Sequence, residues 1–505
     1  MFNTQIIEPF LNSIQEFSDR NAFCINKEYF TYKHLEESIS KIRFQLIDNK
    51  DDIIGLVTND DLETYASIFA LWFEGKAYIP LNPTAPIERN QVIIDQVNVK
   101  TILDSSYGSL QLLENAQTVS TKNLKSVELN HHDVLSKKID NQKIAYILFT
   151  SGSTGTPKGV PITRENIASF VESFWKLGWD IDHNDRCLQM FELIFDMSVM
   201  SYLIPLLKGA CVYTIPKNKI KYSYIFELMD EFELTMTFMV ASILKYIRPY
   251  FDEINCPKMR YSLFAGEALP LSLAEEWAKC IPNARIDNSY GPTEDTIIDA
   301  FYTYNRNGNN EERNGILSFG KAMYNCYMET FDEENNILNV GEIGELCVSG
   351  KQLMPGYINN EKLNQEKFFF KEISGKKIRF YRTGDICIKN STGNFVFVER
   401  KDHQVKVQGY RVELGEIEYY CSEFLKEINA VTIPFSNMVN NTEIALFIET
   451  NEQNVVLDEL KEYLYSKLPA YMIPTQYYFV PKFPVTGSDK IDRVKLKNSI
   501  SNGTK

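Results

Sequence analysis

Short apolar runs alternate with amphipathic stretches through about the first 340 residues of the chain. The runs at 53–57 (IIGLV), 77–81 (AYIPL) and 145–149 (AYILF) have the length and composition of buried strands. Between them, stretches such as 62–75 space their apolar residues as an amphipathic helix does. Strands that alternate with helices favour α/β layers with largely parallel sheets. We therefore predict an α/β fold for this part.

The pattern changes after a polar loop at 305–315. The segments 344–350 (GELCVSG), 380–388 (FYRTGDICI) and 393–400 (GNFVFVER) are short, apolar and separated by glycine-containing turns. They predict antiparallel strands, which would form a small β-barrel-like part of the large domain.

The last block, from about 403 to 498, has its own order of elements. It predicts a strand at 404–412, a helix at 414–427, strands at 430–435 and 443–449, and a helix at 455–468. That order favours a small α+β domain. We predict a large N-terminal domain at 1–401 and a small C-terminal domain at 402–505.

Composition narrows the classes of function. The 505 residues carry a net charge of −14, which argues against a large nucleic-acid surface. The start of the chain lacks the pattern of a signal peptide, and no apolar run reaches the ~18 residues that a membrane span needs. The nine scattered cysteines lack a C-x-x-C pair, so we expect reduced thiols and a cytoplasmic location. The histidines have no metal-binding spacing, and we expect His131 and His132 in a surface loop.

The string FTSGSTGTPKGV, at 149–160, follows the apolar strand at 145–149 directly. Its glycines allow backbone N–H groups to converge, its hydroxyls add donors, and Lys158 adds a positive charge. Such a loop suits a polyphosphate. It does not match the G-x-x-x-x-G-K-[ST] loop of the usual nucleotide hydrolases. The alternative is a flexible serine- and glycine-rich loop without a ligand.

Four later strings add groups of matching chemistry. NSYGPTE at 288–294 offers an aromatic ring for stacking, a threonine for phosphate and a glutamate for Mg²⁺. YRTGD at 381–385 ends in an aspartate that suits two ribose hydroxyls. Arg400 and Asp402 open the segment 399–418, and Lys490 lies in GSDKIDRVKL at 487–496. Each string alone is also compatible with a turn or a solvated charge, but together they indicate nucleotide chemistry.

These strings, with FTYKHL at 30–35, EGKAYIPLNP at 74–83, FAGEALP at 264–270 and PGY at 355–357, resemble the motifs of the adenylate-forming superfamily over nearly the whole chain. This superfamily includes acyl-CoA synthetases, luciferases and amino-acid adenylation domains. The resemblance implies that ATP and a carboxylic acid give an acyl-adenylate and pyrophosphate, and that a thiol then takes the acyl group. It also implies a mobile C-terminal domain that rotates about a hinge.

The resemblance carries roles to matching positions. It implies catalytic roles for Lys490, Thr293 and Glu294, a Mg²⁺ ligand in Glu294, and a hinge at Asp402. The implied ATP-binding residues are Thr150, Ser151, Gly152, Ser153, Thr154, Gly155, Lys158, Gly266, Glu267, Ala268, Asn288, Ser289, Tyr290, Gly291, Asp385, Arg400 and Lys490. The sequence departs from the family pattern in Glu399 before Arg400 and in Ser488-Asp489 before Lys490.

The stretch FELIFDMSVMSYLIPLL at 191–207 contains one acid, Asp196, within an apolar run. A buried carboxylate needs a cationic partner, and the resemblance implies that this partner is the α-ammonium of an amino acid. The residues that match the rest of the substrate pocket are Met197, Met200, Phe238, Leu263, Ala265, Ser289 and Ile297. Apart from the serine they are apolar, so a small or medium neutral side chain is expected. A helix-capping or surface acid is the alternative for Asp196.

The chain is most similar in its motifs to D-alanine–carrier protein ligases, although it has Ala265 where these usually have cysteine. The resemblance implies ATP and Mg²⁺ as cofactors and a separate phosphopantetheinylated carrier protein as acceptor, because few residues follow the Lys490 segment. A stand-alone nonribosomal peptide synthetase adenylation enzyme for another apolar amino acid is the near alternative. A coenzyme A ligase for a plain carboxylic acid and a catalytically silent binding protein are the alternatives from other classes.

Overall fold

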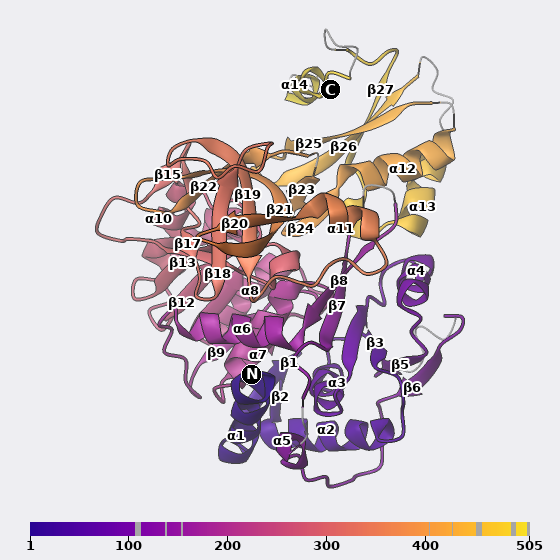
Figure 1. Cartoon of the computed structure of the whole chain (residues 1–505), viewed down its shortest axis with the longest axis vertical. Coiled ribbons are helices and arrows are strands. Elements are labelled where there is room, and N and C mark those ends of the chain that lie inside the picture. Colours follow the sequence, from indigo (N-terminus) through magenta and orange to yellow (C-terminus); the bar gives the residue numbers. More distant parts are fainter. Residues whose placement is uncertain are drawn as a thin grey trace. The chain divides into compact units, whose positions relative to one another are not determined.

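The computed structural model describes residues 1–106, 113–136, 139–152, 155–402, 404–426, 428–450, 457–485 and 491–501 (Figure 1). The chain divides into two compact units. The first unit contains Met1–Pro83, Ile94–Leu148 and Gly159–Lys401. The second unit contains Thr84–Ile93, Phe149–Lys158 and Asp402–Lys505.

A nine-stranded sheet forms much of the first unit. Its six central strands, from β13 to β1 in sheet order, pair in parallel, while the edge strands β2, β14 and β17 are antiparallel. Parallel strands are usually covered on both faces, and most residues of these strands are buried. In sheet order the strands are β17 (Lys321–Ala322), β14 (Ala300–Thr303), β13 (Arg285–Tyr290), β12 (Tyr261–Phe264), β11 (Met236–Met239), β9 (Arg186–Gln189), β10 (Cys211–Thr214), β1 (Asn21–Ile25) and β2 (Glu28–Thr31).

A second sheet has six strands and contains the first predicted apolar runs. The runs at 53–57, 77–81 and 145–149 are confirmed as strands β3, β4 and β7. In sheet order the strands are β6 (Gln117–Ser120), β5 (Thr101–Asp104), β3 (Ile53–Val57), β4 (Ala77–Leu81), β7 (Ile144–Thr150) and β8 (Lys158–Thr163).

Three of the helices between these strands, α2, α3 and α6, begin at side-chain caps. Thr31 and His34 form a reciprocal capping box at the start of α2, Thr163 and Asn166 form another at α6, and Asp61 caps α3. The α-helices are α1 (Glu8–Glu16), α2 (Tyr32–Leu46), α3 (Leu62–Phe73), α4 (Ile87–Val97), α5 (Asp133–Ser136), α6 (Arg164–Trp175), α7 (Asp196–Leu206), α8 (Lys221–Glu231), α9 (Ala241–Ile247), α10 (Leu271–Cys280) and α11 (Glu361–Lys367). Short helical turns are η1 (Asn3–Ile7), η2 (Arg248–Glu253) and η3 (Thr293–Asp295).

The predicted antiparallel strands after residue 340 are present in a third, five-stranded sheet. It contains β18 (Cys326–Phe331), β19 (Ile343–Gly350), β20 (Phe368–Ile373), β21 (Lys376–Lys389) and β22 (Phe395–Arg400), all paired antiparallel. Among the described strands, these pairings do not close into a ring. This part of the first unit is therefore an open sheet rather than a closed barrel.

The second unit has the strands and helices of an α+β domain. Its sheet has the order β25 (Ala430–Ser436), β26 (Thr442–Glu449) and β27 (Gln476–Val480), and its helices are α12 (Leu414–Leu425), α13 (Leu457–Lys467) and α14 (Arg493–Ser501). A short turn, η4, spans Ala470–Met472. Apolar residues of α12, α13 and β26 share one buried cluster, which is the main core of this unit.

Two local predictions were wrong. The expected single strand at 404–412 is a hairpin of β23 (Gln404–Val407) and β24 (Tyr410–Glu413), because Gln408 and Gly409 both adopt positive φ, as a tight hairpin turn requires. The segment 305–315, which was expected to be a polar loop, contains β15 (Glu312–Arg313). This strand pairs antiparallel with β16 (Ile316–Leu317) in a two-stranded sheet.

The prediction that His131 lies in a surface loop was also wrong. It is buried, with 3% of its surface exposed, while its neighbour His132 is exposed. Its ring nitrogens contact Ser40 Oγ at 2.9 Å and Arg43 Nη1 at 2.7 Å. The prediction failed because Ser40 and Arg43 are far from His131 in the sequence, and the polar residues beside His131 do not indicate them.

A helix that spans a membrane needs about 20 mostly apolar residues, which sets a minimum length for the helices of the described residues. None of them is long and apolar enough to cross a bilayer.

Candidate active site

The predicted pocket residues of the first unit come from neighbouring parallel strands and the segments that follow them, and from α7. Phe238 on β11 lies beside Leu263 on β12 in the strand register, and Ser289 on the next strand donates a hydrogen bond to Phe264 O at 2.9 Å. In parallel sheets, strand ends are the usual place for a ligand site. The six apolar members belong to one buried cluster: Met197, Met200, Phe238, Leu263, Ala265 and Ile297.

Asp196 is the first residue of α7 and is half-buried rather than fully enclosed. Its Oδ1 accepts a hydrogen bond from the Met197 N–H at 2.7 Å. The N-terminus of a helix favours a negative charge, so the ionised carboxylate is stabilised at this position. Burial is the main cause that raises the pKa of the Tyr146 hydroxyl, and electrostatic interaction with Tyr78 and Asp196 adds to the shift.

Three residues predicted to bind the nucleotide form one contact network. Tyr290 Oη donates to Asp385 Oδ2 at 2.5 Å, and Arg400 Nη1 donates to Asp385 Oδ1 at 2.8 Å. The Tyr290 ring is stacked on Phe319, with ring centroids 4.6 Å apart. Burial and the nearby Asp385 carboxylate raise the pKa of Tyr290, which keeps its hydroxyl protonated as a donor. The ring and the carboxylate are thus fixed relative to each other.

Glu294 lies in η3 with its side chain completely buried. Its Oε1 accepts a hydrogen bond from Tyr357 Oη at 2.6 Å, and Tyr357 Oη lies 3.0 Å from Tyr381 Oη. Thr293, in the same turn, is partly exposed. Sequence reasoning missed Tyr357 as a partner of Glu294, although the PGY string that contains it was among the matching motifs.

The other predicted nucleotide residues of the first unit have varied local roles. Asn288 donates from Nδ2 to the carbonyl oxygens of Leu317 and Ser318, so its amide links β13 to another segment. Glu267 accepts from the Ser242 N–H at the start of α9, and Gly266 has a φ of 79°. Ala268 is exposed. A Cβ on Gly291 would lie 2.4 Å from Ile297 O, so this position requires glycine.

The predicted phosphate loop belongs to the second unit, where carboxylates occupy its donors. Lys158 Nζ pairs with Glu413 Oε1 at 3.0 Å, and the Gly152 N–H donates to Glu416 Oε2 at 3.1 Å. Ser151 Oγ donates to Arg411 O at 3.0 Å and accepts from the Glu413 N–H at 3.2 Å. The donors predicted to hold phosphate are therefore able to bind anionic oxygens in this geometry.

An ion pair that the sequence did not indicate supports this arrangement. Arg89 Nη1 lies 2.7 Å from Glu416 Oε1, with the Glu416 side chain completely buried. Burial raises the pKa of Glu416, and Arg89 partly opposes this shift. Glu413 and Glu416 lie inside the matched segment 399–418, whereas nothing in the pattern around Arg89 connected it with the loop.

The remaining predicted residues lie beside gaps in the described part of the chain or within those gaps. Thr150 ends β7, and Gly155 has a φ of 78°. Asp402 is exposed, and its Oδ1 accepts from the Gln404 N–H at 3.2 Å. Ser153, Thr154 and Lys490 lie outside the described residues, so their roles stay predictions.

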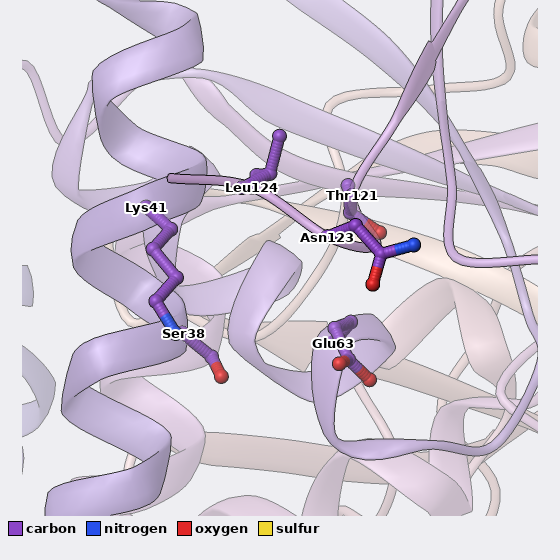
Figure 2. Close-up of a pocket in the computed structure, with 6 residues that line it drawn as sticks. All are labelled: Ser38, Lys41, Glu63, Thr121, Asn123 and Leu124. Carbon is purple, nitrogen blue, oxygen red and sulfur yellow. The ribbon is translucent and has the colours of Figure 1, made fainter. Parts of the chain in front are cut away.

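The first unit also contains a cavity of about 240 Å³. Figure 2 shows Ser38 and Lys41 of α2 on one side of it, with Glu63, Thr121, Asn123 and Leu124 around the rest. None of the predicted site residues is among these six, so the cavity is not the site that the motifs predict.

Comparison with solved structures agrees with the architecture. The adenylation domain AlmE of Vibrio cholerae, in complex with glycyl-adenosine-5'-phosphate, superposes with a TM-score of 0.87 at 25% identity, over 98% of this chain and 97% of that chain. PA1221, a nonribosomal peptide synthetase protein with adenylation and carrier domains, has the same fold at 22% identity, with a TM-score of 0.83 over 97% of this chain and 83% of that chain.

Sequence relatives point the same way. Zwittermicin A synthase ZmaJ of Bacillus cereus is 31% identical over 98% of this chain and 95% of its own length. Bacitracin synthase 1 of Bacillus licheniformis is 30% identical over 97% of this chain, but the match spans only 9% of that protein. The family model described as "AMP-binding enzyme" matches residues 10–358. This chain therefore belongs to the AMP-binding enzyme family.

Proposed function

We propose that this protein uses ATP to activate a small neutral amino acid and then transfers the aminoacyl group to the phosphopantetheine thiol of a separate carrier protein, as a D-alanine–carrier protein ligase does. The observation that carries the proposal is Asp196 at the start of α7, followed on the same helix by the buried residues Met197 and Met200. The carboxylate can pair with a substrate ammonium, and the apolar residues suit an uncharged side chain. The likeness to AlmE, whose complex contains a glycyl adenylate, supports an amino acid as substrate.

In the first step, a carboxylate oxygen of the amino acid attacks the α-phosphorus of ATP. A new oxygen–phosphorus bond forms, the bond to the β-phosphate oxygen breaks, and pyrophosphate leaves. Lys158 and the Gly152 N–H would hold the phosphates that leave, because both already bind carboxylate oxygens. Tyr290 and Asp385 would hold the adenosine, while Lys490 would stabilise charge between the two reacting anions.

Glu294 fits a role as a Mg²⁺ ligand. Mg²⁺ prefers oxygen donors and is commonly held by one or two carboxylates together with substrate phosphates and water. Tyr357 fixes the orientation of this carboxylate through its hydrogen bond to Oε1. When bound, Mg²⁺ would neutralise phosphate charge.

In the second step, the carrier thiol loses its proton, and its sulfur attacks the acyl carbon as the bond to AMP breaks. We propose that residues 402–505 act as a mobile domain and that Asp402 is the hinge, supported by the start of the last segment of the second unit at this residue and by its exposure. We also propose a cytoplasmic location, supported by the unpatterned cysteines.

The near alternative is a stand-alone nonribosomal peptide synthetase adenylation enzyme for another apolar amino acid. The observation that favours it is the match to ZmaJ over 95% of that protein's length. A coenzyme A ligase for a plain carboxylic acid would not need a carboxylate such as Asp196 at the pocket.

ATP–pyrophosphate exchange with a panel of substrates tests the proposal. The panel contains glycine, both enantiomers of alanine, serine and valine, with the des-amino analogue of each. We expect exchange with a small neutral amino acid and little with its analogue. Preference for valine over alanine would favour the alternative adenylation enzyme, and preference for the des-amino acids would overturn the amino-acid assignment.

A further inference from the structure

A strained turn follows Glu294 in the first unit. Thr296 and Ile297 both have positive φ, 57° and 78°, a region that β-branched residues rarely occupy. The Ile298 N–H donates to Thr296 O at 3.1 Å, so the chain makes a three-residue γ-turn with positive φ at its central residue. This form of γ-turn is rare and strained. It therefore needs support from surrounding groups.

Gln352, in the connection between β19 and α11, supplies that support. Its Nε2 donates to the carbonyl oxygens of Asp295 at 3.2 Å, Thr296 at 3.4 Å and Ile298 at 2.8 Å. Thr296 Oγ1 donates in return to Gln352 O at 2.5 Å. Both Gln352 and Thr296 are completely buried. One carboxamide thus binds backbone on both sides of the central residue of the turn.

The bonds of the Gln352 side chain are all donor bonds in the described part of the chain. Gln352 Oε1 is buried and has no hydrogen-bond partner among the described residues. A buried acceptor without a partner is unfavourable. The hydrogen bonds that the Gln352 NH₂ group donates to the turn therefore explain why an amide occupies this position. Close contact between Gly291 and Ile297 O leaves the turn little room to relax in that direction.

The turn contains Ile297, one of the residues predicted to line the amino-acid pocket. The Ile297 side chain is buried and shares a cluster with Met200 and Phe238, both predicted to contact the substrate. Rotation of the backbone at Ile297 would move this side chain within the buried cluster. The position of Ile297 therefore depends on whether the turn keeps its strained conformation.

We propose that Gln352 is a positioning residue for the amino-acid pocket: its carboxamide holds the turn at 295–298, and the turn sets where Ile297 limits the size of the substrate side chain. This inference rests on the proposed function of the pocket. Gln352 itself is not assigned a contact with the substrate, and it acts through Ile297.

The test compares Gln352→Met, which keeps the length of the side chain and removes its donors, with the wild type. Gln365→Met on the exposed surface of α11 is the matched control. In ATP–pyrophosphate exchange, we expect Gln352→Met to raise the KM for the amino acid by about tenfold, with a smaller change in kcat. The KM for ATP should stay within about threefold, and discrimination against a side chain one methylene larger should weaken. Gln365→Met should behave as the wild type.

Gln352→Asn gives a milder test if the methionine variant does not fold, since it keeps the amide on a shorter side chain. An equal loss of affinity for ATP and the amino acid, or an unchanged KM for the amino acid in a folded variant, would overturn the inference. Hydrogen exchange of a peptide covering 291–300 adds a readout that needs no substrate: exchange should accelerate in both Gln352 variants. If the wild type activates no amino acid, the proposed function fails, and unchanged exchange in this peptide would separately show that Gln352 does not hold the turn.

Discussion

Tyr290 donates its hydroxyl to Asp385 at 2.5 Å, so the predicted stacking ring and the predicted ribose-binding carboxylate are joined by a direct hydrogen bond. Arg400 contacts the other oxygen of the same carboxylate. A carboxylate held from two sides has fewer orientations to lose when it binds ribose hydroxyls.

Removal of the Tyr290 hydroxyl tests this relationship. In Tyr290→Phe the ring can still stack, but Asp385 loses one hydrogen bond, so we expect the KM for ATP to rise about threefold to tenfold, the effect of ~1 kcal/mol. The KM for the amino acid should change less. Tyr324→Phe, at an exposed tyrosine, is the control. An unchanged KM for ATP would mean that Asp385 does not need this contact.

Substitution of Glu413 tests whether carboxylates compete with phosphate at the loop. Glu413→Gln removes the negative charge that pairs with Lys158, so we expect ATP to bind up to about tenfold more tightly. Isothermal titration with ATP measures the change, and Glu423→Gln, at an exposed position, is the matched control. Weaker binding in Glu413→Gln than in the control would show that the carboxylate supports ATP binding instead of opposing it.

Asp196→Asn tests the partner of the substrate ammonium. The amide keeps the size of the side chain and removes its charge, so we expect the KM for the amino acid to rise by at least about a hundredfold, as for a charge pair that becomes buried when the substrate binds. The KM for ATP should remain close to that of the wild type. Exchange is measured with the amino acid and with its des-amino analogue; an equal effect on both substrates would contradict the ammonium assignment.

Lys490→Ala tests the predicted catalytic cation. Loss of a charge contact made in the transition state costs ~3 kcal/mol or more, which corresponds to at least about a hundredfold in kcat for adenylation. Lys482→Ala, at an exposed lysine of the same unit, serves as control. Exchange is measured beside far-ultraviolet circular dichroism. Near-normal exchange in a folded Lys490→Ala protein would remove this residue from the mechanism.

The lowered pKa of His131 predicts that the free energy of unfolding depends on pH. Burial and the nearby Arg43 lower the pKa of His131 from 6.5 to about 4. Below pH 6.5 the unfolded chain therefore binds a proton that the folded chain does not, so the free energy of unfolding falls as the pH falls towards 4, by about 3 kcal/mol in total from this group.

Denaturant titrations of the wild type and His131→Gln between pH 4 and 7 measure this effect. The variant should lose part of the slope, while His132→Gln, at the exposed neighbour, should retain it. Parallel curves for the wild type and His131→Gln would show that His131 does not carry the dependence.

The sequence pattern predicted the parts of the structure that local periodicity determines. The apolar runs gave β3, β4 and β7 correctly, and the motif strings identified Tyr290, Asp385 and Arg400, which lie in contact. Partners from distant segments were not visible: Arg89 and Glu416 are 327 positions apart. The contact between Gln352 and Ile298 could not be predicted either, because the two residues are 54 positions apart and no helix period or turn motif relates them. The hairpin at 404–413 was missed because Gln408 gives a weaker turn signal than asparagine or aspartate would.

The ion pair between Lys158 and Glu413 has a consequence for which anions the loop admits. A ligand that enters must displace a carboxylate that is already close to the lysine, so a singly charged anion gains little by the exchange. A polyphosphate has several charged oxygens and can replace the contacts at Lys158 and Gly152 together. If the loop holds phosphates as proposed, this arrangement would favour nucleoside triphosphates and pyrophosphate over simple carboxylates and monovalent anions.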